Sequence, residues 1–393
     1  MDVASIPLKT SLPNETANNR FLRALWAELR AEFGKLAWQY VPVRDGRRNE
    51  IYFGYADIGL SGTIRIGVTY KKRSIIDRVV FWDFFGNTDM PKDRFERCVR
   101  LAEGATETEI IISAKILIPY GLYFQSVERH GVVSILHYEN ATYLSLRVLA
   151  FDEADAAYKF ALHTKPILDV LSSFTNLFLN LGEYNNLLPS PPDAHRSTLL
   201  PDLDWLDGFP TIDGMVVLPE QCFALIDAVV CDDLNVQKQQ LIDACHHFHA
   251  ARMLEEQSHS FPSTQSVSAE LALVLYMSCL EVLSLINAPP PRTCPTCNQV
   301  QYGISARVTE FIEKHHGSAV AQVVKELYSA RSKYLHVGRL LSSRSYTGQA
   351  IPQLDSSSTN GIRSPMPIVP LLNLREFTSF CIRAVIYDLI EVR

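Results

Sequence analysis

A proline-rich segment divides the chain into two parts with different hydrophobic patterns. Six prolines lie between Leu187 and Pro219, and such a density excludes a long helix or a central strand there. Before this segment, runs rich in Ile, Val, Phe and Tyr alternate with turn residues, which is typical of strands. After it, hydrophobic residues recur at helical spacing. We predict an α+β domain over residues 1–186, a linker over 187–217 and a helical domain over 218–393.

The hydrophobic pattern also gives the elements of each part. We expect strands at 51–55, 63–70, 78–84, 109–120, 132–138 and 142–151, with helices at 18–37, 91–102 and 153–179. Such runs favour a mainly antiparallel sheet with flanking helices. The C-terminal part is expected to be an all-α bundle with helices at 232–257, 264–286, 304–315, 319–336 and 373–392.

Bulk properties limit the class of protein. The chain has 393 residues, of which 47% are hydrophobic and 20% charged, as in a globular protein of two domains. The N-terminus lacks a basic region followed by an apolar core, and the apolar runs are too short to span a bilayer. Eight irregularly placed cysteines fit a reducing compartment. We therefore expect a soluble cytoplasmic protein without a membrane anchor.

The segment from Leu327 to Leu341 carries the clearest chemical pattern. Arg331 and His336 are separated by four residues, and Gly338 follows where helices commonly stop. His336 should lie in the last helical turn, where the macrodipole favours a protonated imidazole. The formal charge of the chain is −6, yet no acidic residue lies between 326 and 355, and the basic residues there are Arg331, Lys333, Arg339 and Arg344. This local excess predicts a site for an anion such as phosphate.

The spacing of Arg331 and His336 leaves more than one arrangement open. Residues five apart on a helix point about 140° away from each other, because each residue turns about 100°. Either the long arginine bends round the helix end, or two copies of the chain share the site as a dimer. A further interpretation is that Arg331 pairs with a core carboxylate and that His336 is an ordinary helix-end residue.

The Arg-Ser-Lys-Tyr-Leu-His sequence resembles the signature of the HEPN superfamily, in which an arginine and a polar residue precede a histidine. The helix from Ala272 to Leu283, with its Leu-Glu pair, looks like the companion helix of the ApeA-like branch. The resemblance covers roughly residues 218–393 by helix order, and only the motif is specific. Ser332 stands where asparagine is commonest in the family, which keeps the polar character.

This resemblance implies a HEPN-type endoribonuclease that cuts single-stranded or loop RNA, such as a tRNA loop, without a metal cofactor. It implies a homodimer with a bacterial anti-phage defence or toxin role, and a phage-derived trigger. Arg331 and His336 would be catalytic, supported by Ser332 and Glu281. The RNA-binding residues would be Lys333, Tyr334, Arg339 and Arg344. A non-catalytic HEPN module that dimerises and binds RNA or protein is the alternative.

Glu281 is the most informative carboxylate because it lies within an apolar helix. A buried carboxylate needs a partner, and Arg331 is the expected one. This pair would fix the guanidinium and would not itself take part in catalysis.

Cys294 and Cys297 form a Cys-Pro-Thr-Cys sequence that suits half of a structural zinc site. The sequence does not show which residues supply the remaining zinc ligands: a second chain could supply the same pair, or the long helix could supply Cys245, His246, His247 and His249. His246 and His249 share one helix face, which points either to solvent or to a groove of the bundle. A reduced loop without metal is the alternative.

Overall fold

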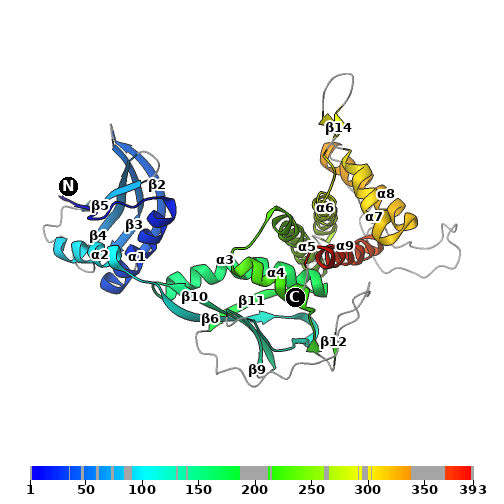
Figure 1. The fold of residues 1–393 in the computed structure, drawn as a ribbon, viewed down its shortest axis with the longest axis horizontal. Helices are drawn as coiled ribbons and strands as arrows, with labels where there is room; N and C mark the ends of the chain where they lie inside the picture. Colours follow the sequence, from blue (N-terminus) through cyan, green and yellow to red (C-terminus); the bar gives the residue numbers. More distant parts are fainter. Residues whose placement is uncertain are drawn as a thin grey trace. The chain divides into compact units, whose positions relative to one another are not determined.

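The computed structural model divides into two compact units, and Figure 1 shows their elements in chain order. Unit 1 comprises Met1–Ile111 and Arg147–Phe160, and unit 2 comprises Ile112–Leu146 and Ala161–Arg393. The residues that the structure describes are 2–34, 36–45, 48–58, 62–71, 75–83, 91–129, 132–138, 140–185, 211–212, 215–260, 265–290, 292–293, 300–301, 303–337 and 368–390.

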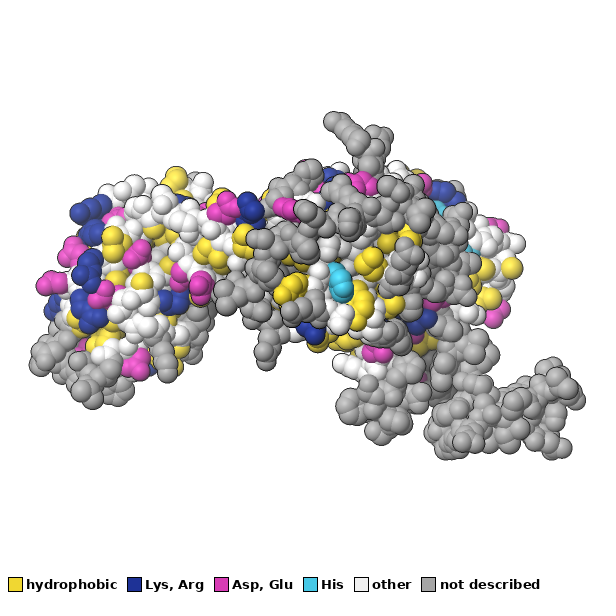
Figure 2. Space-filling model, turned by 90° about the horizontal axis from the view of Figure 1, so that it is seen from below, with side chains coloured by type: hydrophobic (Ala, Val, Ile, Leu, Met, Phe, Trp, Pro, Cys, Tyr) yellow, Lys and Arg dark blue, Asp and Glu magenta, His cyan; other side chains and the backbone are white. Residues whose placement is uncertain are grey.

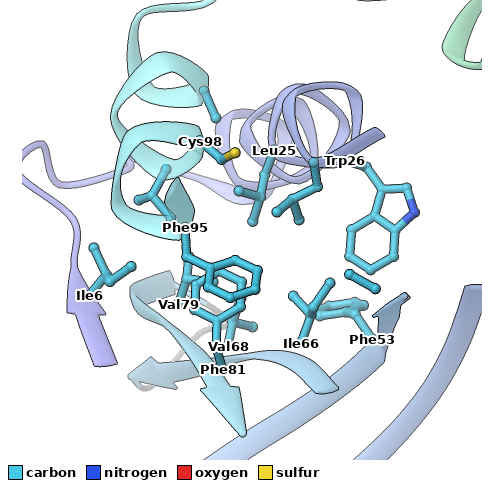
Figure 3. Close-up of a cluster of buried hydrophobic side chains, with 14 of the residues drawn as sticks. Ile6, Leu25, Trp26, Phe53, Ile66, Val68, Val79, Phe81, Phe95 and Cys98 are labelled. Carbon is cyan, nitrogen blue, oxygen red and sulfur yellow. The ribbon is translucent and has the colours of Figure 1, made fainter. Parts of the chain in front are cut away.

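Unit 1 is built on a five-stranded antiparallel sheet. Its strands are β1 (Asp2–Pro7), β2 (Leu36–Asp45), β3 (Arg48–Asp57), β4 (Thr63–Lys71) and β5 (Ile75–Asp83). They pair in the order β1-β5-β4-β3-β2, so the first strand adds to the end of a meander. Helices α1 (Glu15–Phe33) and α2 (Lys92–Gly104) cover one face of this sheet (Figure 3).

The hydrophobic core of unit 1 lies between these helices and the sheet (Figure 3). Leu25 and Trp26 project from α1, while Ile66 projects from β4, and each is at most 2% exposed. Phe95 of α2 stacks on Phe81 of β5, with ring centroids 4.2 Å apart. Helical and strand periodicities thus place apolar residues on the facing surfaces, and their burial supplies the main stabilisation of the unit.

The surface of unit 1 mixes the two signs of charge. On the face seen in Figure 2, basic and acidic side chains of unit 1 lie next to one another (left). An ion pair contributes to the mixing of charges in unit 1: Arg30 lies 2.7 Å from Asp152, and both side chains are partly exposed. On this face, the described side chains therefore give no extended basic surface for a polyanion.

Unit 2 contains a second five-stranded sheet and most of the helices. The larger sheet is formed by β6 (Thr108–Leu117), β8 (Val127–Arg129), β9 (Val133–Tyr138), β10 (Ala141–Ala150) and β11 (Asn180–Asn185), in the order β11-β6-β10-β9-β8. A short turn, η2 (Pro119–Gly121), precedes β7 (Tyr123–Phe124), which pairs with β13 (Met215–Val216) beside β12 (Thr211–Ile212). The division between the units falls within β6, β10 and α3 (Glu153–Thr175).

The rest of unit 2 is mainly helical. Its helices are α4 (Glu220–Val230), α5 (Val236–Ser260), α6 (Gln265–Leu283), α7 (Ile304–His316), α8 (Ser318–Val337) and α9 (Ile368–Leu389), with a small hairpin of β14 (Arg292–Thr293) and β15 (Val300–Gln301). Helix α5 packs along α6, and α9 packs against both. Phe248 of α5, Tyr276 of α6 and Ile382 of α9 are fully buried at the centre of this packing.

The predicted order of an antiparallel α+β region followed by a helical region is confirmed at that level. The strands form two main sheets where the prediction had one, and the boundary between the two units passes through strands β6 and β10 of the second sheet. The predicted helix 153–179 ends at Thr175 and runs through Pro166. Residues 187–210 and 213–214 of the predicted linker lie outside the described residues, and two short strands, β12 and β13, lie near its end.

Among the helices that the structure describes, none is both long and apolar enough to cross a membrane.

Candidate functional site

The candidate site is built on α8, which ends at Val337 and therefore carries His336 in its last turn, as predicted. Arg331 lies one and a half turns before this residue, and its side chain points back to α6. There its Nη1 atom donates to Glu281 Oε1 at 2.6 Å, and its Nη2 atom donates to Glu281 Oε2 at 3.1 Å. This two-pronged contact confirms the predicted pairing of Glu281 with Arg331, and it fixes the plane of the guanidinium.

Tyr328 completes the environment of Glu281. Its hydroxyl donates to Glu281 Oε1 at 2.6 Å, and its ring lies 5.5 Å from the guanidinium carbon of Arg331. Burial, together with the hydrogen bond to this carboxylate, raises the pKa of Tyr328 to about 12. The phenol therefore remains a donor at neutral pH. The sequence analysis missed this role, although Tyr328 and Arg331 have the i, i+3 spacing that brings side chains together on a helix.

The guanidinium of Arg331 keeps donor capacity beyond the ion pair. Its Nη2 atom also lies 3.4 Å from Ser278 Oγ, but its buried Nε atom has no hydrogen-bond partner among the described residues. The side chain of Arg331 is 15% exposed. A guanidinium that is held in one orientation can bind an oxyanion such as a phosphoryl group when that oxyanion replaces one of its present acceptors.

The other predicted site residues differ in how the structure describes them. Ser332 and Tyr334 lie on α8 and are half-buried, while the side chains of Lys333 and His336 fall outside the description. Arg339 and Arg344 follow α8 in residues 338–367, which also lie outside the described part. The structure therefore brings Arg331 and Glu281 together and leaves the remaining assignments as predictions.

The predicted zinc site involves residues that the structure does not describe. Cys294 and Cys297 lie within residues 294–299, outside the described part of the chain. Of the residues proposed to complete the site, Cys245 is fully buried, and burial raises the pKa of its thiol to about 12. His246 and His249 both contact Asp169 on α3. The described residues contain no group of three His, Cys, Asp or Glu side chains that could hold a metal ion, and the zinc site stays a prediction.

No family model, no curated protein and no solved structure matches this chain.

Removal of the Tyr328 hydroxyl should weaken the site measurably. We expect Tyr328→Phe to lower the free energy of unfolding by about 1.5–3 kcal/mol, because the hydroxyl donates to a charged, partly buried acceptor. Urea denaturation at neutral pH would measure this loss. Tyr334→Phe is the matched control on the same helix, since none of the described contacts of Glu281 involves Tyr334.

The effect of Tyr328→Phe should also depend on pH. The pKa of Tyr328 is raised in the folded protein to about 12, above the value of about 10 expected in the unfolded chain. The protonated hydroxyl therefore contributes its full stabilisation below about pH 10 and loses it as the pH rises towards the folded value. If the difference in unfolding free energy between the wild-type protein and Tyr328→Phe already declined between pH 6 and 8, this assignment would be contradicted.

Proposed function

We propose that this chain is a metal-independent endoribonuclease of the HEPN type, in which Arg331 and His336 form the catalytic pair. The observation that carries the proposal is the fixed guanidinium of Arg331, held by Glu281 on the helix that has His336 in its last turn. The resemblance of the Arg-to-His segment to the HEPN signature supplies the reaction class.

The chemistry of RNA cleavage suits these two residue types. RNA contains its own nucleophile, the 2′-hydroxyl group, which loses a proton as it attacks the adjacent phosphorus atom. A histidine that titrates near neutral pH can accept or donate a proton in this reaction. An arginine can bind the phosphoryl oxygens and stabilise the negative charge that develops on them. Such a mechanism requires no metal ion.

We further propose that two copies of the chain share the site. Positions 331 and 336 are five residues apart, which separates them by about 140° round an ideal helix axis, so a single helix would not direct both residues at one phosphate. Helix α8 also exposes apolar residues: Val323 is 46% exposed and Leu335 is 49% exposed. Burial of these side chains between two α8 helices would stabilise a two-fold dimer and bring two arginines and two histidines together.

Further elements of the proposal extend from this site. Ser332 would support the catalytic pair, and Lys333, Tyr334, Arg339 and Arg344 would contact the RNA strand. Unpaired regions, such as a tRNA loop, would be preferred because their backbone can align the 2′-hydroxyl with the leaving oxygen. The protein would act in the cytoplasm as a defence enzyme or toxin, with a phage-derived trigger. Cys294 and Cys297 would hold a structural zinc ion.

One observation favours a second candidate function, a non-catalytic HEPN module that binds RNA or protein. Both Nη atoms of Arg331 are engaged by Glu281, which neutralises the charge that a phosphoryl group would need. In this case the Arg331–Glu281 pair joins α8 to α6 and has only a structural role.

Incubation of purified protein with total cellular RNA, with and without EDTA, tests the two candidates. We expect fragments with a 2′,3′-cyclic phosphate and a 5′-hydroxyl, formed equally well with EDTA, while DNA survives because it lacks the 2′-hydroxyl. Mapping of the fragment ends would identify the cleavage sites. Tight RNA binding without cleavage would favour the binding module, and cleavage that strictly requires magnesium would contradict the proposed mechanism.

A further inference from the structure

A second group of titratable side chains lines a cavity of about 320 Å³ in unit 2. The cavity lies between α3, α5 and the chain that enters β11. Its polar residues are Thr164, Lys165, Asp169, Asn180, His246 and His249, and its apolar residues include Leu168, Phe178, Leu181 and Met253. Lys165 is 62% exposed and His246 is 46% exposed, so a molecule can reach this group from solvent.

Asp169 is the buried centre of the group and is 3% exposed. Its Oδ1 atom lies 2.7 Å from Nδ1 of His249, whose Nε2 atom lies 2.8 Å from the backbone oxygen of Leu179. His249 therefore lies between two hydrogen-bond acceptors and holds the carboxylate of Asp169 in place.

Lys165 and His246 occupy the open side of the same carboxylate. Nδ1 of His246 lies 2.5 Å from Nζ of Lys165 and 3.2 Å from Oδ2 of Asp169. An ammonium group can only donate, so Nδ1 of His246 is the acceptor in the closer contact. Nζ of Lys165 also lies 3.5 Å from Nε2 of His246 and 3.5 Å from Oδ2 of Asp169. The exposed sides of Lys165 and His246 can still donate to a ligand that enters from solvent.

The donors and the shape of the cavity favour an anion attached to a flat group. The ammonium of Lys165 lies 3.5 Å from Oδ2 of Asp169 and is exposed, so it can also contact an anion from the open side of the cavity. Phe178 provides an aromatic face, with its ring centroid 5.5 Å from that of His249, and the amide of Asn180 can pair with a polar edge. Bases stack on aromatic rings of this kind. The volume lies at the small end of the range for ligand sites, about 300–1,000 Å³.

We propose that this cavity binds one nucleotide, with the phosphate at Lys165 and His246 and the base beside Phe178. Asp169 and His249 position the donors and do not contact the phosphate. The nucleotide is either a free mononucleotide or one unit of a single-stranded RNA, because both present the same phosphate and base. This site is separate from Arg331 and Glu281, and binding here does not require the proposed ribonuclease activity.

Isothermal titration calorimetry on the full chain tests the proposal with two probes, adenosine 5′-monophosphate and a 2′-O-methyl RNA hexanucleotide. The second probe lacks the nucleophilic hydroxyl, so its binding is independent of cleavage. We expect saturable binding of at least one probe, and the tighter probe identifies the source of the nucleotide. Lys165→Ala and His246→Gln should each weaken this binding roughly tenfold or more, since each removes a donor to a charged group.

Lys238→Ala is the matched control, because Lys238 is also a lysine of unit 2 and its ammonium lies 3.0 Å from Asp233, away from the cavity. It should leave binding unchanged. Absence of binding by both probes at millimolar concentration would overturn the proposal, as would binding that Lys165→Ala and His246→Gln leave intact. Either result would mean that the polar side chains of the cavity serve only to link α3 to α5.

Discussion

Replacement of His336 by alanine should reduce RNA cleavage by about 10²–10⁴-fold and leave RNA binding nearly unchanged. The magnitude is that of losing one group that transfers a proton in the transition state. Arg331→Ala should weaken both binding and cleavage, because the guanidinium would contact the phosphate. Arg331→Lys should restore little, since an ammonium is a point charge and does not reproduce the fork of an arginine. Initial rates on a labelled single-stranded RNA, with separate binding measurements, would show these differences.

A mixing experiment distinguishes a shared site from a site within one chain. If Arg331 of one copy acts with His336 of the other, mixed dimers of Arg331→Ala and His336→Ala chains contain one intact pair and regain part of the activity. If each chain holds its own pair, the mixture stays inactive. Full cleavage by the His336→Ala protein would refute the catalytic assignment altogether.

Glu255→Ala should destabilise the helical part of unit 2 by about 3–5 kcal/mol, the loss typical of removing one partner from a buried ion pair. Glu255 is 5% exposed and Arg252 is 3% exposed, and their side chains are hydrogen-bonded on α5. The hydroxyl of Tyr276 also donates to Glu255 Oε2, at 2.6 Å. The substitution therefore leaves a buried cation short of a counter-charge and a buried hydroxyl without this acceptor. Urea denaturation followed by circular dichroism would measure the change.

Glu256→Ala is the matched control for this prediction. Glu256 Oε1 accepts from the same arginine at 2.8 Å, but its side chain is 30% exposed, so water can replace the contact. We expect a loss of about 1 kcal/mol or less. Equal losses for the two variants would show that burial does not determine the strength of these contacts.

Local features of the sequence were sufficient to predict the helix and the pair at the candidate site. The glycine at sequence position 338 predicted a helix end near it, and α8 ends at Val337. Glu281 required a partner because it lies in an apolar helix. Both inferences depend on a few neighbouring residues. They therefore held without knowledge of the tertiary structure.

Features that depend on pairing between distant segments were not predictable in the same way. Hydrophobic alternation indicates a strand but not its neighbour, so the separation of the strands into two main sheets was missed. The single carboxylate that joins His246 and His249 belongs to Asp169 on another helix. The pairing of Arg252 with Glu255 has ordinary helical spacing, and only its burial makes it important.

Because Arg331 is already paired with Glu281, an oxyanion that binds Arg331 must replace the carboxylate of Glu281. A phosphate that approaches the guanidinium competes with a carboxylate already bonded through two oxygens, so its net gain is the difference between two ion pairs. A lone phosphate ion gains little from such an exchange. A polymer that is anchored by neighbouring contacts can displace the carboxylate, because its local concentration at the site is high. If RNA binds at Arg331 as proposed, the pair would therefore select against small anions and in favour of long ones.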